Sequence, residues 1–156
     1  MELVRRAGAD DAEELVRLRA VMLASIIGER PKPGEWVARA AESLRRRLPE
    51  PDARIAAFVV DDPDGGLAAC AVGVVEERLA GPDSPSGLNG YVFNVVTDPR
   101  WRRRGFSRAC MTALIAWFAD HGVRLVDLRA SDEGLPLYTK LGFELQHGPA
   151  MRLRLP

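Results

Sequence analysis

The chain has 156 residues, of which 47% are hydrophobic, and its 22 basic and 22 acidic side chains give a formal net charge of zero. A neutral chain gives no reason to expect a nucleic-acid partner, and no apolar run approaches the ~18 residues of a membrane-spanning helix. A chain of this length should bury roughly 70% of the surface that its unfolded form exposes, so we expect one domain over residues 1–156 that needs neither disulfides nor a structural metal.

Cys70 and Cys110 have no metal-ligand spacing and are predicted to be buried thiols. The two histidines, His121 and His147, form no cluster in the sequence, so no metal site is expected. The acidic, helix-forming N-terminus does not resemble a signal peptide, and the cytoplasm is therefore the expected location.

The first half of the chain predicts two helices followed by a hairpin. In chain order, the expected elements are a strand over residues 2–6, a helix that begins after Asp10 or Asp11, a second helix over residues 35–48, and strands over residues 55–60 and 67–75. Pro31 and Pro33 separate the two helices, because proline ends a helix. The residues between the two strands are all Asp, Pro or Gly, which favours a tight turn.

The second half predicts a strand, a long helix and further strands. In chain order, the expected elements are a strand over residues 91–97, a helix over residues 108–121, a strand over residues 123–128, a short helix from Ser131 or Asp132 through Leu141, and final strands from Glu144 onward that include Met151, Leu153 and Leu155. The strand over residues 91–97 is apolar on both faces, which is typical of a strand inside a sheet.

An arginine-rich stretch, Arg102-Arg103-Arg104-Gly105-Phe106-Ser107-Arg108, follows that strand and leads into the long helix. A loop that passes from a strand into a helix leaves backbone N–H groups unpaired, and the positive end of the helix dipole favours an anion there. Gly105 allows the backbone to approach a ligand closely. A basic run can also be plain solvated surface, but helix N-termini tolerate cations poorly, so this cluster indicates an anion site suited to a pyrophosphate. The stretch matches neither the P-loop nor the glycine pattern of a dinucleotide fold.

Two segments carry specific motifs: one reads Arg102-x-x-Gly105-x-Ser107, and the other, from Leu137 to Phe143, reads Leu-Tyr-Thr-Lys-Leu-Gly-Phe. The first is similar to the phosphate loop Arg/Gln-x-x-Gly-x-Gly/Ala of the GNAT superfamily of acyl-CoA-dependent N-acetyltransferases. The second resembles the Leu-Tyr-x-Lys-Leu-Gly-Phe segment that ends the last helix of that family. Arg103 stands where a glycine is frequent, and Ser107 replaces the final Gly or Ala. The motifs occur in the family's order, and the resemblance in pattern extends over essentially the whole chain.

The resemblance implies an α/β fold, classed as α+β by some schemes. It has a mixed, mostly antiparallel central sheet of about six to seven strands, about four flanking helices and a splayed central parallel pair. It also implies an N-acetyltransferase that takes acetyl-CoA as acyl donor and moves the acetyl group to a primary amine by direct attack in a ternary complex. The implied cofactor-binding residues are Val95, Val96, Thr97, Arg102, Arg103, Arg104, Gly105, Phe106, Ser107, Arg108 and Ser131. Tyr138 is the implied catalytic residue, as general acid to the departing thiolate; the alternative is a packed ring whose hydroxyl bonds to backbone.

The base that would deprotonate the amine is not evident. A lysine-like amine with a pKa of ~10.4 is mostly protonated at pH 7, and deprotonating it costs about 4.6 kcal/mol. Many family members place a glutamate on the central strand for this purpose, but Asn94 occupies that strand here. The remaining candidates are Glu76, Glu77, Asp98, Asp132, Glu133 and an ordered water.

Several alternatives stay open. The amine acceptor is unidentified, and small amines, antibiotics, peptide termini and protein lysines all fit. A noncatalytic acyl-CoA-binding or regulatory domain would use the same anion site; the missing strand glutamate favours it, whereas Tyr138 favours an enzyme. A nucleic-acid-binding module is disfavoured because the chain is neutral and lacks an aromatic-rich stacking surface. The resemblance is compatible with a homodimer formed through the terminal strands.

Overall fold

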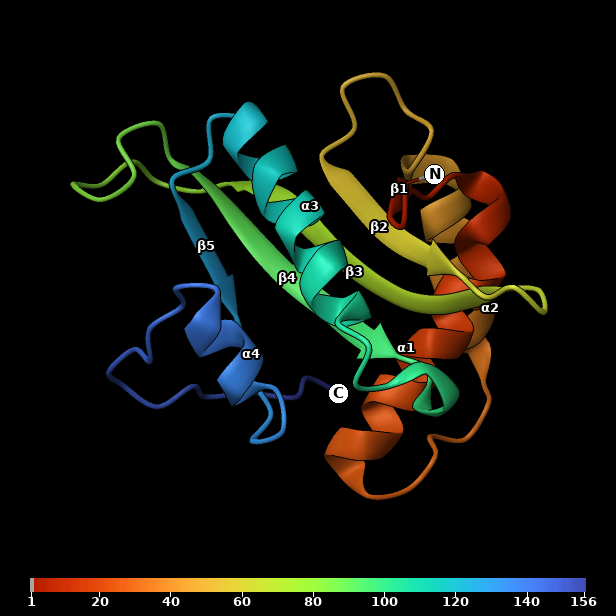
Figure 1. The fold of residues 1–156 in the computed structure, drawn as a ribbon. Coiled ribbons are helices and arrows are strands. Elements are labelled where there is room, and N and C mark those ends of the chain that lie inside the picture. Colours follow the sequence, from red (N-terminus) through yellow and green to blue (C-terminus); the bar gives the residue numbers. More distant parts are fainter. Residues whose placement is uncertain (1) are drawn as a thin grey trace.

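The computed structural model describes residues 2–156, and Figure 1 shows how its helices and strands are arranged. The strands are β1 (Arg5–Arg6), β2 (Ile55–Asp61), β3 (Leu67–Glu77), β4 (Leu88–Thr97) and β5 (Leu125–Leu128). The helices are α1 (Ala12–Ile27), α2 (Glu35–Arg47), α3 (Phe106–Asp120) and α4 (Leu135–Lys140), with short 3₁₀ turns η1 (Ala9–Asp11) and η2 (Pro99–Trp101). The predicted helix pair, hairpin, long helix and short last helix are therefore confirmed.

The sheet has the order β1-β2-β3-β4-β5. Neighbouring strands are antiparallel, except that β4 and β5 run parallel. This mixed, mostly antiparallel sheet with four α-helices confirms the predicted fold class.

The predicted strand count of six to seven is wrong for the described residues, because the sheet has five strands and residues 144–156 form none. The large apolar residues of this segment are exposed, Leu145 by 81% and the alternating Met151, Leu153 and Leu155 by 93%, 83% and 81%. Alternation indicates a strand only where one face is buried against a neighbouring layer. No element within residues 2–156 covers this segment, so its pattern alone does not produce a strand.

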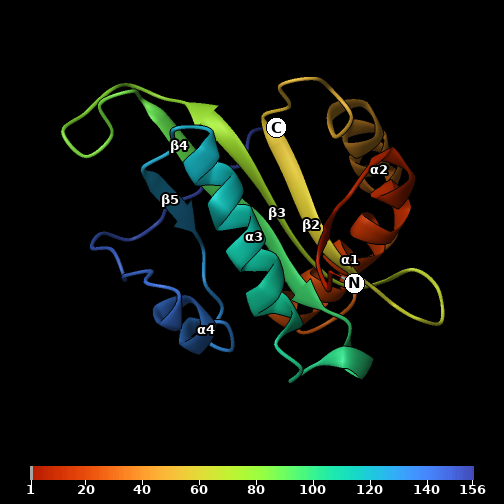
Figure 2. The same ribbon diagram turned by 45° about the horizontal axis from the view of Figure 1, so that its top comes forward.

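Helices cover both faces of the sheet (Figure 2). One core lies between α3 and the sheet and includes Met111, Leu114 and Phe118, and a second core with Leu15 and Leu18 lies between α1 and the sheet. Helix α2 packs mainly against α1. Both cysteines are buried in these cores, as predicted, and burial raises the pKa of Cys110 to about 12.

Glycines allow α3 to lie close to the sheet. A Cβ atom at Gly73 would come within 2.7 Å of the Phe118 ring, and one at Gly90 within 2.8 Å of the same ring. Because such contacts are far too short, these strand positions must lack a side chain. The small residues let Phe118 fill the space over β3 and β4.

Strand β4 leaves its parallel neighbour halfway along its length. Its register against β3 passes from Asn94 directly to Val92, so Phe93 forms a β-bulge. Strand β5 pairs only with residues 89–92 of β4, which leaves residues 93–97 without a partner on that side. The bulge and the short β5 therefore open a gap in the sheet, as expected for a splayed parallel pair.

Candidate functional site

A cavity of about 780 Å³ occupies the gap between β4 and β5. Its walls come from the second half of β4, the first turn of α3, the C-terminal end of α1, and the segment from β5 through α4. The predicted site residues that line it are Val95, Val96, Thr97, Arg102, Arg103, Gly105, Phe106, Ser107, Arg108, Ser131 and Tyr138. Residues from the strand end, the arginine-rich stretch and the last helix therefore surround one space.

The first turn of α3 presents open backbone amides to this cavity. Gly105 is the N-cap, with a φ of 77°, and no side chain caps the helix. A Cβ atom at Gly105 would meet nothing within 4 Å, so the space in front of the helix end is free. Arg103 also has a positive φ, of 63°. A left-handed residue just before a helix turns successive N–H groups toward one point, which makes a concave anion site.

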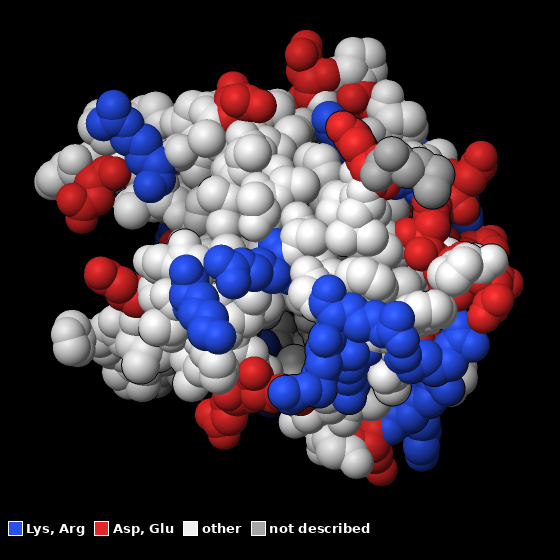
Figure 3. All heavy atoms as spheres, in the orientation of Figure 1, with Lys and Arg blue, Asp and Glu red and all other residues white. Residues whose placement is uncertain are grey.

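Cations dominate the walls of the cavity. The charged lining residues are Arg102, Arg103, Arg108, Arg129, Lys140 and one carboxylate, Glu133. Within residues 2–156, none of these five cations forms an ion pair. Figure 3 shows Lys and Arg side chains gathered on both sides of a hollow in this face. Unpaired positive charge beside a helix N-terminus provides strong attraction for a polyanion.

Arg104 is the one predicted binding residue that does not line the cavity. Its guanidinium carbon lies 4.8 Å from the centroid of the Trp101 ring, a cation–π contact on the loop itself. Ser107 and Thr97 line the cavity and share a hydrogen bond of 2.6 Å between their hydroxyl groups. This bond ties the first turn of α3 to the end of β4.

Tyr138 lies on α4 and lines the cavity from the opposite side. Its ring packs edge-on against Phe143 at 5.9 Å, and a Cβ atom at Gly134 would come within 2.7 Å of the same ring. Burial raises the pKa of the Tyr138 hydroxyl above its ordinary value, so the group is protonated at neutral pH. No hydrogen bond joins this hydroxyl to another residue in 2–156, which leaves it free to donate to a ligand.

A left-handed glycine follows the helix that carries Tyr138. Gly142 has a φ of 99°, and the Phe143 amide donates to the Tyr138 carbonyl at 3.0 Å. This turn folds Phe143 back against the tyrosine ring.

The candidate bases lie in very different places. Only Glu133 lines the cavity; Glu76 and Glu77 are exposed at the far end of β3, and Asp132 is exposed beside the cavity. Asn94 is 3% exposed, and its side-chain oxygen accepts a hydrogen bond of 2.6 Å from Arg19 of α1. The strand position at Asn94 is thus occupied by a neutral side chain that is already paired.

Asp98, at the start of the loop between β4 and α3, forms an ion pair with Arg17 and does not line the cavity. Burial alone would raise the pKa of Asp98, but the Arg100 amide and the Arg17 guanidinium outweigh burial and hold the pKa below its ordinary value. Its carboxylate lies 2.9 Å from the Arg17 guanidinium. A carboxylate held this way is a weak base, so Asp98 is a poor candidate for deprotonating an amine.

The sequence did not point to several other residues that line the cavity. They are Val21, Met22, Ser25 and Ile26 on α1, Phe93 at the bulge, and Arg129 after β5. The helical spacing of apolar residues in α1 predicts a buried face, but this pattern does not predict that the last turns of α1 lie beside the gap between β4 and β5. Lys140 is part of the last motif, so the motif itself could have identified this residue.

Within residues 2–156, no group of three or more His, Cys, Asp or Glu side chains lies close enough to hold a metal ion. None of the helices in this part of the chain is both long and apolar enough to cross a membrane.

The fold and the cavity together define a mixed α/β protein with a polyanion site beside the open part of its sheet, and comparison with known proteins gives its family. The profile of the Acetyltransferase (GNAT) family matches residues 23–143, so the chain belongs to this family of enzymes. This confirms the family to which the two motifs point.

Individual relatives are distant. A glucosamine 6-phosphate N-acetyltransferase from Trypanosoma brucei brucei is 38% identical over 66 residues, which span 42% of this chain and 44% of that protein. A GCN5-related N-acetyltransferase from Ralstonia eutropha superimposes with a TM-score of 0.78 at 26% identity, covering 96% of this chain and 97% of that one. A predicted acetyltransferase with acetyl-CoA from Clostridium acetobutylicum has a TM-score of 0.83 at 20% identity, covering 97% and 94%.

Proposed function

We propose that this protein transfers an acetyl group from acetyl-CoA to a primary amine by direct attack within a ternary complex. The observation that carries the proposal is that one cavity joins the open N-terminus of α3 to Tyr138 along the unpaired edge of β4. A ligand with a polyanionic group at one end, a long uncharged arm and a reactive group at the other end matches the three parts of the cavity: the helix N-terminus, the strand edge and Tyr138. The neighbour from Clostridium acetobutylicum, which was solved with acetyl-CoA, supports the same donor.

The proposed placement follows the chemistry of each wall. The pyrophosphate would accept hydrogen bonds from the amides after Gly105 and contact Arg102, Arg103 and Arg108. The pantetheine arm would lie beside Val95, Val96 and Thr97, because the free edge of β4 offers backbone groups that an extended amide chain can pair with. The thioester would then lie near Tyr138.

In the proposed reaction, the free amine attacks the thioester carbonyl and forms a tetrahedral oxyanion. The C–S bond then breaks, and the leaving sulfur takes a proton from the Tyr138 hydroxyl as the amide product forms. The proton that the amine loses returns through water to the Tyr138 oxygen, so one turnover moves one proton from nitrogen to sulfur. A thiol has a pKa of ~8.5, so the thiolate already leaves well and proton donation assists the step. Glu133, the carboxylate of the cavity wall, is the proposed route for removing the amine proton, directly or through water.

The acceptor is proposed only as a class. The similarity to a glucosamine 6-phosphate N-acetyltransferase makes amino sugars and their phosphates the first compounds to screen. A cytoplasmic location, a single domain over residues 1–156 and a homodimer stay predictions.

A noncatalytic acyl-CoA-binding role is the second candidate. The pairing of Asn94 with Arg19 favours it, because it leaves no carboxylate at this point of β4. Binding of acetyl-CoA without turnover of any amine would support this role over the enzyme.

The first experiment compares thermal unfolding of the protein with and without acetyl-CoA. At one hundred times the dissociation constant, a ligand stabilises the folded state by ~2.7 kcal/mol. We expect a clear rise in the unfolding temperature, followed by thiol release when a suitable amine is added. No rise with acetyl-CoA, CoA or longer acyl-CoA compounds would contradict the proposal.

A further inference from the structure

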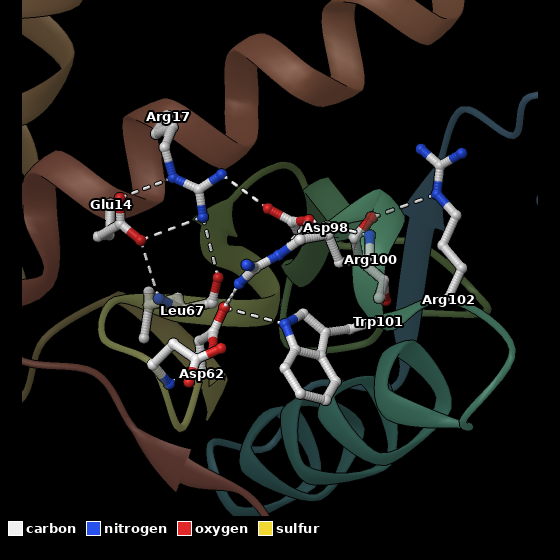
Figure 4. A network of polar contacts seen from close by, with 10 residues as sticks. Glu14, Arg17, Asp62, Leu67, Asp98, Arg100, Trp101 and Arg102 are labelled. Carbon is white, nitrogen blue, oxygen red and sulfur yellow. Dashed lines mark hydrogen bonds and ion pairs between the residues drawn. The ribbon is translucent and has the colours of Figure 1, made fainter.

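A network of charged groups surrounds the short loop that leads from β4 to α3 (Figure 4). This loop, residues 98–105, contains η2 and ends at the Gly105 cap. Two carboxylates attach it to its surroundings: Asp98 is the first residue of the loop and pairs with Arg17 of α1, whereas Asp62 belongs to the turn between β2 and β3 and pairs with the loop from outside. Neither carboxylate lines the cavity proposed to bind acetyl-CoA.

Asp62 is the best-buried carboxylate of this network. Its side chain is only 4% exposed, and it accepts a hydrogen bond of 2.9 Å from the Trp101 indole N–H. It also accepts a bond of 2.9 Å from the Asp64 amide and is paired with the Arg100 guanidinium. A buried carboxylate is tolerated only when it is paired and hydrogen-bonded, so these contacts fix Trp101 and Arg100 firmly in place.

Trp101 transmits this constraint to the anion site. The Arg104 guanidinium lies 4.8 Å from the centroid of its ring, and the Phe106 ring stacks against it at 6.4 Å and 30°. Arg104 and Phe106 flank Gly105, the residue whose backbone forms the helix cap. The indole therefore contacts the chain on both sides of the cap while Asp62 anchors its N–H.

The turn that carries Asp62 is itself attached to α1. Glu14 accepts a hydrogen bond of 2.8 Å from the Leu67 amide, and Arg17 donates one of 3.0 Å to the Leu67 carbonyl. Arg17 also bonds to Asp98 at 2.9 Å. The turn, α1 and the loop thus form one connected set of ion pairs and hydrogen bonds.

We propose that Asp62 is a positioning residue for the anion-binding loop, acting through Trp101 to hold residues 102–107 in the conformation that receives the phosphates. The inference rests on the proposed function. The loop includes two left-handed residues, Arg103 and Gly105, and a non-glycine residue such as Arg103 adopts this conformation only when its surroundings enforce it. Amides held in place before binding give tighter binding than amides that must be ordered during it.

Two variants test the proposal against a matched control. Asp62→Ala removes all contacts of the carboxylate, and Trp101→Phe keeps an aromatic ring but cannot donate to Asp62. Asp61→Ala is the control: the neighbouring carboxylate is 58% exposed and pairs with Arg5 instead of the loop. Because Asp62→Ala could fail to fold, Trp101→Phe keeps the test decisive.

The first readout is hydrogen exchange of the backbone amides without ligand. In both test variants we expect exchange of the two hydrogen-bonded amides at the ends of the loop, those of Trp101 and Ala109, to accelerate about tenfold, the effect of losing one hydrogen bond to a charged group, while β3 keeps its protection. The second readout is the dissociation constant of CoA and of inorganic pyrophosphate, both of which we expect to rise about tenfold. The control should match the wild type in the exchange of the loop amides and in both dissociation constants, because Asp61 pairs with Arg5 and not with the loop.

Unchanged loop exchange in the folded variants, or an equal effect in Asp61→Ala, would overturn the positioning role. A general loss of stability would accelerate exchange in β3 as well and would also contradict it. If the wild type binds no CoA but its loop still depends on Asp62 and Trp101, the proposed function fails while the positioning of the loop stands.

Discussion

Tyr138 is the residue whose surroundings most directly suggest chemistry. Tyr138 lines the cavity, its hydroxyl forms no hydrogen bond within residues 2–156, and its ring is held by Phe143 and by the absence of a side chain at Gly134. Burial raises its pKa, which keeps the proton on the oxygen at neutral pH. A protonated, unpaired and fixed hydroxyl is what a general acid requires.

We expect Tyr138→Phe to lower kcat by about 10- to 100-fold and to leave the KM for acetyl-CoA unchanged. Phenylalanine keeps the ring that packs on Phe143 and removes only the proton donor. Because the pKa of Tyr138 is raised, the wild-type kcat should fall only at strongly alkaline pH, and this fall should be absent in the variant. Steady-state thiol release over a range of pH checks both points, and an unchanged kcat in the variant would contradict a role in proton donation.

At the scale of elements, the N-terminus of α3 determines where a polyanion can bind. Its open amides and the free space in front of Gly105 provide the site, and the surrounding arginines increase its affinity. We expect Gly105→Asp to abolish CoA binding, because a carboxylate would occupy the place of the phosphate and repel it.

Gly105→Asn is the matched control for that variant. Asparagine has nearly the same shape as aspartate and tolerates the left-handed backbone at this position, where φ is 77°, but it carries no charge. Calorimetric titration with CoA should show a smaller loss of affinity for Asn than for Asp. Wild-type affinity in a folded Gly105→Asp protein would show that the phosphates bind elsewhere.

Local patterns predicted most elements correctly, because proline, glycine and apolar spacing determine where α1, α2, β2 and β3 begin and end. The arginine-rich stretch and the Tyr138 segment were likewise visible as motifs, and both line the cavity. The bulge at Phe93 could not be predicted, since it depends on the register of β4 against β3. The strands expected after Glu144 were wrong for a similar reason: alternation says nothing about whether another layer is present to cover one face.

Arg104 shows the same limit at a smaller scale. It shares the charge and the loop of its neighbours, but the Trp101 ring draws its side chain away from the cavity. That contact depends on the placement of Trp101 by Asp62, which lies 39 residues away in the chain. A motif therefore predicts where a loop lies in the chain, but it does not predict the directions in which the side chains of the loop point.

The whole molecule is bound together by ion pairs that join distant parts of the chain. Arg5 of β1 bonds to Asp11 and to Asp61, and these contacts hold the pKa of both carboxylates below the ordinary value. The network around the anion-binding loop lowers further pKa values, those of Glu14, Asp62 and Asp98. Glu14 is lowered chiefly by Arg17, and Asp62 chiefly by the Asp64 amide.

These shifts predict the direction in which stability depends on pH. A carboxylate with a lowered pKa in the folded state binds its proton less readily than in the unfolded chain, where the value is about 3.9 for Asp and about 4.3 for Glu. The unfolded state therefore takes up more protons as the pH falls, and the free energy of unfolding decreases with it. The stabilisation by these groups is fully present above about pH 5 and is lost progressively below about pH 4.

Urea unfolding at a series of pH values between 7 and 3 measures this dependence, and Arg5→Gln shows how much of it belongs to one pair of contacts. The variant removes the guanidinium that lowers the pKa of Asp11 and of Asp61, so the folded-state pKa values of both should return toward those of the unfolded chain. Its stability should be lower than that of the wild type at pH 7 and should change less between pH 5 and pH 3, because fewer protons are then taken up on unfolding. If the stability of the wild type is constant or rises on acidification, these ion pairs do not stabilise the folded state. If the curve of Arg5→Gln runs parallel to that of the wild type, the Arg5 contacts do not cause the acid sensitivity, and the network around Asp62 and Asp98 is its source.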